Sequence, residues 1–366
     1  MGTSFSAGSD ELLRLFDLPR ARIYVDTASY GLPPRATVSA LEEALDRWRT
    51  GSADWMVDWD PAGDDCRVLI ATLLSVPSDE IALLPAVSAG VAALAAALGP
   101  GDEVVIPADE FNSLLLPFLV AERHMGARVR RVPFERVADS VTETTTVIAT
   151  SHVRSNDGAV QDLDAAGEAA KACGALIVVD ATHSAGIVPL EIERRGLDIV
   201  YLAAYKHLLC PRGVAFMRVA PEHKRRLQPY AASWRSTASP YSSYYGAALD
   251  DLASGAAQFD LSLAWHSWVG ARESLRFLSS IPEEERRSWC VGLASRLAKR
   301  LGVAPTGSSV VGVPVVGDSR EVRAALEAAG VVVSMPLGQV RVSFHVYNQL
   351  QDVERVAAVL DELVLR

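Results

Sequence analysis

The chain has 366 residues, of which 49 % are hydrophobic and 22 % are charged, and its formal net charge is −10 at pH 7. This length and apolar content predict a globular protein of two domains with a large core. The acidic balance argues against a nucleic-acid-binding surface, and no apolar stretch is long and uninterrupted enough to predict a membrane span.

Short apolar runs alternate with helical segments between residues 65 and 220. Helices are predicted between the strands, for example at Gly90–Leu98, Leu114–Met125 and Asp164–Cys173. Continuous apolar strands separated by helices indicate a mainly parallel sheet that is covered on both faces. The seven predicted strands are Ile81–Leu84, Glu103–Ile106, Arg128–Val132, Thr146–Thr150, Ala175–Val179, Asp198–Leu202 and Val214–Val219.

The composition changes to Ser, Tyr, Ala and Gly between Ser233 and Gln258, which predicts an ordered loop leading into a second domain. Three further helices are expected after it, near residues 263–278, 283–301 and 350–365, with short strands between the second and the third. The fold class is therefore α/β. We expect an N-terminal arm over residues 1–20, a large domain over 21–245 and a smaller α+β domain over 246–366.

The four cysteines lie far apart in the sequence and form no C-x-x-C pair, and the seven histidines show no metal-ligand spacing. Free thiols in a reducing cytoplasm are expected, with neither a disulfide framework nor a metal site. Residues 1–20 contain no apolar core and cleavage site of a secretory signal, which also favours a cytoplasmic protein.

One of only four lysines, Lys206, directly follows the apolar run Ile199–Tyr205. Buried lysines are rare without a chemical role, and burial lowers the pKa toward that of a Schiff-base amine. Asp180 ends another buried strand, so both groups are expected at one sheet edge. The pair suggests a pyridoxal phosphate site. The competing interpretations are a lysine that reaches solvent and an aspartate that caps a helix.

Four segments carry a resemblance to the class V aminotransferase family of fold-type I pyridoxal phosphate enzymes. Two are central: residues 178–186 (VVDATHSAG) and 198–213 (DIVYLAAYKHLLCPRG). Residues 24–34 (YVDTASYGLPP) and 340–348 (VRVSFHVYN) extend the resemblance over nearly the whole chain. Within the family, the sequence is most similar to the branch that contains kynureninases, C–S lyases and isopenicillin-N-epimerase-like proteins. Enzymes of ergothioneine-type and lincosamide pathways are the expected nearest relatives.

The resemblance implies roles around the cofactor ring. Lys206 would form the Schiff base and move protons at the substrate α-carbon. Asp180 would hold the protonated pyridine nitrogen, and His183 would contact the cofactor's 3′-oxygen. Phe111 would stack on the ring, and Ser155 aligns with a cofactor-contacting asparagine.

The cofactor phosphate is expected at the helix N-terminus after the strand Ile81–Leu84, where free N–H groups favour an anion. Here the sequence departs from the family pattern, because Val87 stands where a threonine is common and Ala203 where desulfurases carry a serine. Ser88 and Tyr205 are the expected replacements, together with main-chain amides. Ala256 likewise replaces a threonine that a neighbouring subunit often donates, and a homodimer with shared sites is still expected from the resemblance.

Arg341 is the candidate for binding the α-carboxylate of an amino-acid substrate, because a guanidinium offers bidentate geometry. Asp26, Tyr30 and Arg235 are the other expected substrate-pocket residues, with loop packing as the alternative for each.

The expected reaction is cleavage of the Cβ–S bond of an S-substituted L-cysteine by β-elimination. Desulfurases use a nucleophilic cysteine before the C-terminal arginine motif, and residues 302–340 contain none. Transamination and decarboxylating oxidative deamination remain alternatives, as does a catalytically inactive pyridoxal phosphate-binding protein. The alanine- and arginine-rich composition suggests a bacterial source and specialised metabolism such as antibiotic biosynthesis.

Overall fold

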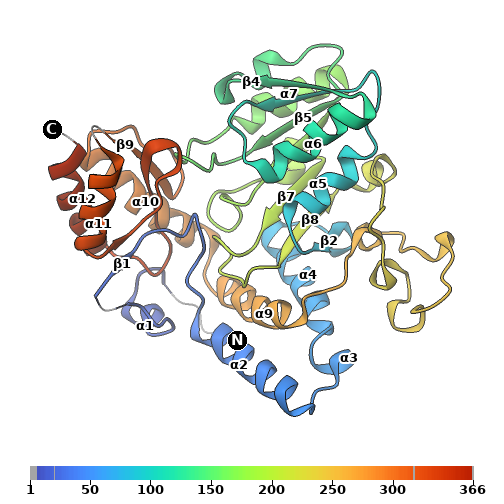
Figure 1. Cartoon of the computed structure of the whole chain (residues 1–366), viewed down its shortest axis with the longest axis horizontal. Coiled ribbons are helices and arrows are strands. Elements are labelled where there is room, and N and C mark those ends of the chain that lie inside the picture. The colour runs from blue at the N-terminus through green and yellow to red at the C-terminus, as the bar shows by residue number, and fades with distance from the viewer. Residues whose placement is uncertain (1–5, 20, 316–317, 365–366) are drawn as a thin grey trace.

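The computed structural model describes residues 6–19, 21–315 and 318–364. Parts of the expected N-terminal arm (residues 1–5 and 20) and the expected last helical residue, 365, lie outside these ranges. The helices are α1 Asp10–Leu13, α2 Arg35–Thr50, α3 Trp55–Asp58, α4 Pro61–Leu74, α5 Val87–Ala95, α6 Asn112–Met125, α7 Leu163–Cys173, α8 Ile192–Arg195, α9 Trp265–Ser279, α10 Glu283–Arg300, α11 Ser319–Ala328 and α12 Leu350–Val364 (Figure 1). The strands are β1 Ile23–Tyr24, β2 Ile81–Leu84, β3 Glu103–Pro107, β4 Arg128–Val132, β5 Val147–Ser151, β6 Leu176–Asp180, β7 Ile199–Ala203, β8 Ala215–Val219, β9 Val310–Pro314, β10 Val331–Val332 and β11 Gln339–Ser343.

A seven-stranded sheet in the order β2-β8-β7-β6-β5-β3-β4 forms the centre of the molecule. All neighbouring strands are parallel except β8, which runs antiparallel to both β2 and β7. The predicted mainly parallel sheet is confirmed, and the seven predicted strands match the observed ones to within one residue at each end. Apart from the edge strand β4, which is arginine-rich and mostly exposed or half-buried, the strands are continuous apolar runs, and such runs mark strands buried on both faces.

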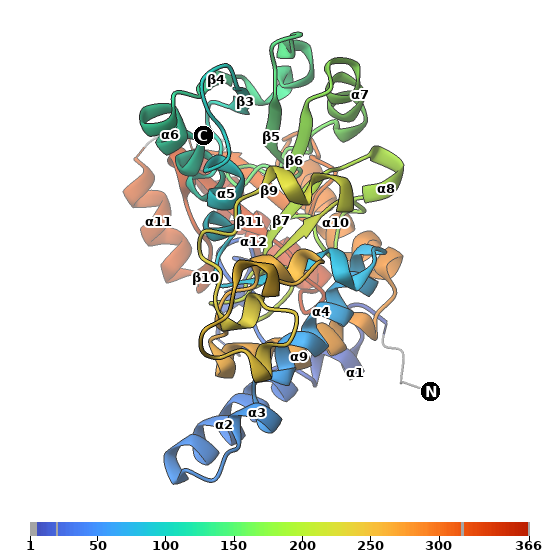
Figure 2. The same cartoon turned by 90° about the vertical axis from the view of Figure 1, so that its right-hand side faces the viewer.

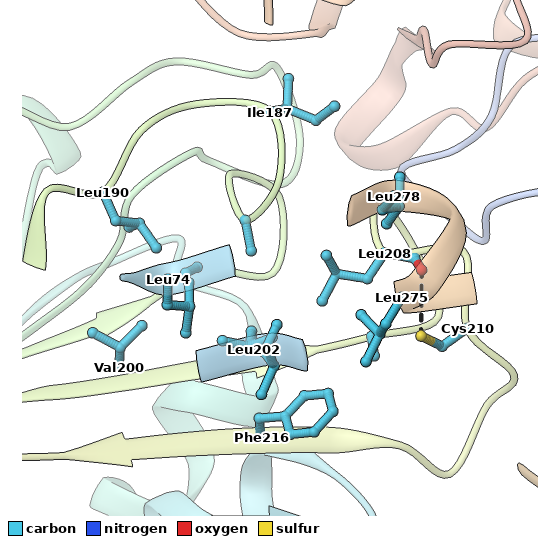
Figure 3. Close-up of a cluster of buried hydrophobic side chains, with 14 of the residues drawn as sticks. Leu74, Ile187, Leu190, Val200, Leu202, Leu208, Cys210, Phe216, Leu275 and Leu278 are labelled. Carbon is cyan, nitrogen blue, oxygen red and sulfur yellow. Dashed lines mark hydrogen bonds between the residues drawn. The ribbon is translucent and has the colours of Figure 1, made fainter. Parts of the chain in front are cut away.

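Helices cover both faces of the sheet, and the alternation of side chains along each strand decides which face each residue meets. On β7, for example, Val200 and Leu202 pack with α4, α7 and α9, whereas Ile199 and Tyr201 pack with α5 and α6. Figure 2 shows these layers from the side. Figure 3 shows part of the core on the face covered by α4, α7 and α9. There, Leu202 and Phe216 of the sheet lie below Leu275 and Leu278 of α9.

The C-terminal part of the chain forms a separate core with the first strand. Strands β9 and β11 pair antiparallel, and β1 pairs in parallel with β10, so residues 23–24 join residues 331–332. Apolar side chains of α10, α11 and α12 complete this core. The fold therefore contains the expected large sheet and the smaller α+β unit, while the domain limits at residues 20 and 245 stay predictions.

Within residues 6–19, 21–315 and 318–364, no helix is both long and apolar enough to cross a membrane. The same residues contain no group of three or more His, Cys, Asp or Glu side chains placed to hold a metal ion.

Candidate active site

The carboxyl ends of the central strands open into one pocket. Asp180 is the last residue of β6, Lys206 lies in the connection from β7 to β8, and α5 starts at Val87 just after β2. The pocket is lined by Pro85, Ala86, Val87, Phe111, Ser113, Ser151, Ser155, Asp180, Thr182, His183, Ala203, Tyr205, Lys206, Arg212 and Val214. Seven of the residues singled out from the sequence are therefore brought together.

Lys206 is a buried amine, and its side chain is only 5 % exposed. Its Nζ lies 3.0 Å from His183 Nε2 and 5.0 Å from the centroid of the Phe111 ring. Burial lowers the pKa of Lys206 to about 8, although the negative charge of Asp180 opposes the shift. A considerable fraction of this amine is therefore neutral near pH 8, as a nucleophile or base requires.

Asp180 and His183 flank the lysine in a nearly dry environment. Burial raises the pKa of Asp180, while a 2.8 Å hydrogen bond from the Thr182 N–H to Oδ1 acts in the opposite direction. Burial also lowers the pKa of His183 well below its usual value, so the imidazole is neutral. Its Nδ1 is buried and has no hydrogen-bond partner among the described residues.

Glu110 is a buried acid beside the pocket that the sequence interpretation did not single out. Its carboxylate accepts hydrogen bonds from the Ser151 N–H at 2.7 Å, the Ser151 hydroxyl at 2.6 Å and the Phe111 N–H at 2.7 Å. Burial, with a smaller contribution from the nearby charge of Asp180, raises the pKa of Glu110 to about 7. Glu110 thus fixes the main chain of the aromatic residue that faces Lys206. Only the three-dimensional contact with β5 reveals this role.

A Glu110→Gln variant should change how stability depends on pH. Because the pKa of Glu110 is higher in the folded protein than the ordinary 4.5, folding takes up a proton between these values. Its contribution to stability is therefore present below about pH 4.5 and is lost as the pH rises through about 7. We expect the free energy of unfolding of the cofactor-free wild type to fall relative to Glu110→Gln over this range, by on the order of 1–3 kcal/mol. Denaturant titrations at pH 5 and pH 8 measure this; parallel curves would contradict it.

The N-terminus of α5 forms one end of the pocket. Its N-cap, Ala86, provides no side-chain hydrogen bond to the first helical turn. The Ala89 N–H donates to the Ala86 carbonyl at 3.2 Å, which leaves the two N–H groups before it, those of Val87 and Ser88, to face an anion. Val87 contributes to this end of the pocket, whereas Ser88 lines a different, apolar groove between α5 and α6. The hydroxyl of Ser113 at the start of α6 borders both cavities and was not expected.

Arg341 lies at the other end, behind Ser155. Its Nη1 donates to the Ser155 carbonyl at 2.8 Å and to the Ser155 hydroxyl at 3.3 Å, and its Nη2 donates to Ser29 at 2.9 Å. Asp26 is 3.6 Å from Nη2, a loose ion pair. Within the described part of the chain, the buried Nε of Arg341 has no acceptor. The guanidinium therefore keeps a donor for a ligand.

None of the four expected substrate residues is part of the pocket lining itself. Arg341 and Asp26 lie behind Ser155, and the other two have different surroundings. Arg235 is buried elsewhere, ion-paired with Asp60 and, at 2.8 Å, with Asp64, in a cluster rich in tryptophan. Tyr30 is 53 % exposed and its ring packs beside Tyr24, at 5.3 Å between centroids. Because the guanidinium of Arg235 already forms ion pairs with these two aspartates, Arg235 is not part of the proposed site.

Comparisons with known proteins show to which family this chain belongs. The family model "Aminotransferase class-V" matches residues 23–312, which is most of the chain and includes the whole pocket. The chain belongs to the class V aminotransferase family. The family expected from the sequence is thereby confirmed, while the narrower ergothioneine and lincosamide branches stay predictions.

Relatives of this class V protein carry several activities in their names. A probable cysteine desulfurase of Methanothermobacter thermautotrophicus is 24 % identical, with 97 % of this chain and 98 % of that protein aligned. A kynureninase of Deinococcus radiodurans is 30 % identical over 62 % of this chain and 58 % of its own length. A crystal structure of a cystine C–S lyase with its product cysteine persulfide has a TM-score of 0.85 at 17 % identity, covering 94 % of this chain and 98 % of its own. That likeness confirms the fold.

Proposed function

We propose that this protein cleaves the Cβ–S bond of an S-substituted L-cysteine by β-elimination, using pyridoxal 5′-phosphate. The observation that carries the proposal is the buried, partly neutral Lys206, which contacts His183 and is influenced by the charge of Asp180, in a pocket lined by no cysteine among the described residues. Membership of the class V family supports an enzyme of the cysteine desulfurase and C–S lyase type.

The described residues fit the cofactor that the family implies. Asp180 is a buried carboxylate in need of a counter-charge, which a protonated ring nitrogen provides. His183 has an unpartnered Nδ1, and the first turn of α5 lacks a side-chain cap. Phe111 offers a ring face next to Lys206. Lys206 would hold the cofactor covalently, Asp180 and His183 would orient its ring, and the α5 amides would hold its phosphate. When bound, pyridoxal phosphate supplies an electron sink conjugated with the substrate α-carbon.

Proton transfer and substrate binding are then carried out by side chains of the protein. Lys206 Nζ removes the proton from the substrate α-carbon, because its depressed pKa leaves it able to accept a proton near neutral pH. His183, 3.0 Å away and neutral, keeps the amine hydrogen-bonded without adding a positive charge. Arg341 binds the α-carboxylate through its free Nε and an Nη group, and thereby orients the substrate.

The positions of the cysteines favour elimination over a persulfide-forming desulfuration. Cys66, Cys210 and Cys290 are buried, and burial raises the pKa of each thiol above its usual value. Cys173 lies at the end of α7, with its sulfur 3.4 Å from the Ala169 carbonyl. No cysteine in the described ranges lines the pocket, so no thiolate is placed to take sulfur from the substrate.

A product analysis separates the candidate reactions. Purified protein loaded with pyridoxal phosphate is mixed with a panel of S-substituted L-cysteines, and the products are identified by mass spectrometry. We expect pyruvate, ammonia and the free thiol in equal amounts. A keto acid that retains the sulfur substituent, together with conversion of the cofactor to its amine form, would show that the reaction is transamination and not elimination. A carbon-dioxide-releasing oxidation would also overturn the proposal.

The setting of this reaction is part of the same proposal. The family resemblance supports a homodimer with the active site near the subunit interface, in the cytoplasm. The proposed partner is a small amino acid, with neither nucleic acid nor membrane involved. Bacterial specialised metabolism is the proposed context for the substrate side chain.

A further inference from the structure

Arg212 is a cation at the pocket that none of the assigned roles uses. It lies in the connection between β7 and β8, and the antiparallel register aligns Ala203 with Ala215 and Leu84 with Ala215. Residues just before Ala215 therefore run beside the residues just after Leu84, which lead into the N-terminus of α5. In Figure 1, β2, β7 and β8 lie side by side next to α5. Sheet pairing thus places Arg212 near the anion-binding end of the pocket.

The position of Arg212 is defined by its own connection. The Ala204 N–H donates to the Val214 carbonyl at 3.0 Å, and the Cys210 N–H donates to the Ala204 carbonyl at 3.0 Å. The following residue, Gly213, has a φ of +94°, a conformation that side chains rarely allow. The Arg212 guanidinium lies 5.2 Å from the centroid of the Tyr205 ring, a cation–π contact that restricts its direction.

Other arginines around the site are already engaged, and Arg212 is not. Arg154 and Arg341 each form an ion pair with a carboxylate. Across residues 6–19, 21–315 and 318–364, Arg212 has neither an ion pair nor a hydrogen bond, although it lines the pocket with Lys206 as the second cation. A guanidinium with five free donors at a helix N-terminus suits a phosphate.

We propose that Arg212, held against Tyr205, binds the cofactor phosphate together with the α5 amides. It would replace the hydroxyl groups that the sequence lacks at Val87 and Ala203. This inference rests on the proposed function, because it requires the cofactor phosphate to lie at α5. The β7–β8 connection would then hold the cofactor in two ways. Lys206 would attach it covalently, and Arg212 would neutralise the charge of its phosphate.

Binding of two cofactor forms tests the assignment without relying on turnover. Cofactor-free wild type, Arg212→Ala and Arg212→Lys are titrated with pyridoxal phosphate and with pyridoxal, which has the same aldehyde but no phosphate. Binding is followed by protein fluorescence. Arg131→Ala serves as the matched control, because Arg131 is an exposed arginine on β4, away from the pocket.

We expect Arg212→Ala to weaken pyridoxal phosphate binding by about tenfold or more, the scale of a lost charged hydrogen bond, and to leave pyridoxal binding nearly unchanged. Arg212→Lys should recover part of the loss, and Arg131→Ala should behave as wild type. Equal weakening of both ligands, or of neither, would overturn the assignment, as would a change confined to the KM of the amino acid. Failure of the wild type to bind pyridoxal phosphate would instead overturn the proposed function and this inference with it.

Discussion

Replacement of Lys206 by alanine should reduce turnover by about 10⁴-fold or more, because it would remove both the proposed covalent anchor and the proposed base at the substrate α-carbon. The chain offers no substitute amine. Its other lysines are Lys171, Lys224 and Lys299, and none of them lines the pocket. Initial rates of thiol release from the best substrate of the panel measure the effect.

The control for this variant is Lys171→Ala, which removes an exposed lysine on α7 and should retain full activity. Lys206→Ala should still bind pyridoxal phosphate non-covalently, because Asp180, His183 and the α5 amides are unchanged. Turnover within tenfold of wild type would remove Lys206 from the mechanism. Loss of folding, seen as a lost thermal transition, would require the comparison to be repeated with Lys206→Gln, which keeps most of the side-chain volume.

Replacement of Arg341 by alanine should lower kcat/KM by about 10- to 100-fold, mainly through KM, since a hydrogen bond to a charged group contributes about 1.5–3 kcal/mol. The affected contact is the one between the guanidinium and the substrate α-carboxylate. Steady-state kinetics with an S-substituted cysteine and with its carboxamide give the necessary comparison. The loss should be large for the acid and small for the amide, because only the acid has a charge for Arg341 to bind.

Arg341 also supports the fold, so a second variant is needed. Its Nη1 donates to the Ser155 carbonyl and its Nη2 donates to Ser29. Arg341→Lys retains a positive charge but loses the bidentate geometry, and should have an intermediate KM. Equal loss for acid and amide in both variants would show that Arg341 only positions Ser155 and its neighbours.

The strands and the positions of Asp180 and Lys206 could be predicted from the sequence for a common physical reason. Buried parallel strands have continuous apolar runs, and groups at their carboxyl ends meet at one sheet edge. Asp180 and Lys206 follow such runs directly, so their meeting could be predicted without knowing the loops. His183 lies three residues after Asp180, and its place beside the lysine was expected from the family resemblance.

Residues whose neighbours are distant in sequence were not predictable in the same way. Glu110 depends on Ser151 across the sheet, and Arg212 depends on the reversed direction of β8. Ser88 was expected at the phosphate because of its sequence position, but one helical residue rotates a side chain by about 100°, which is consistent with its lining the outer groove. Arg235 carries a charge whose partner, Asp60, lies 175 residues earlier.

The pairing of β1 with β10 has a consequence for how the site is assembled during synthesis. The strands that carry the proposed ring-binding residues, from β2 to β8, end at residue 219. The carboxylate-binding half joins Asp26 to Ser334 and Ser29 to Arg341, across separations of 308 and 312 residues. The carboxylate side of the proposed site is therefore completed only by residues that are made near the end of translation, whereas Lys206 and Asp180 are made much earlier.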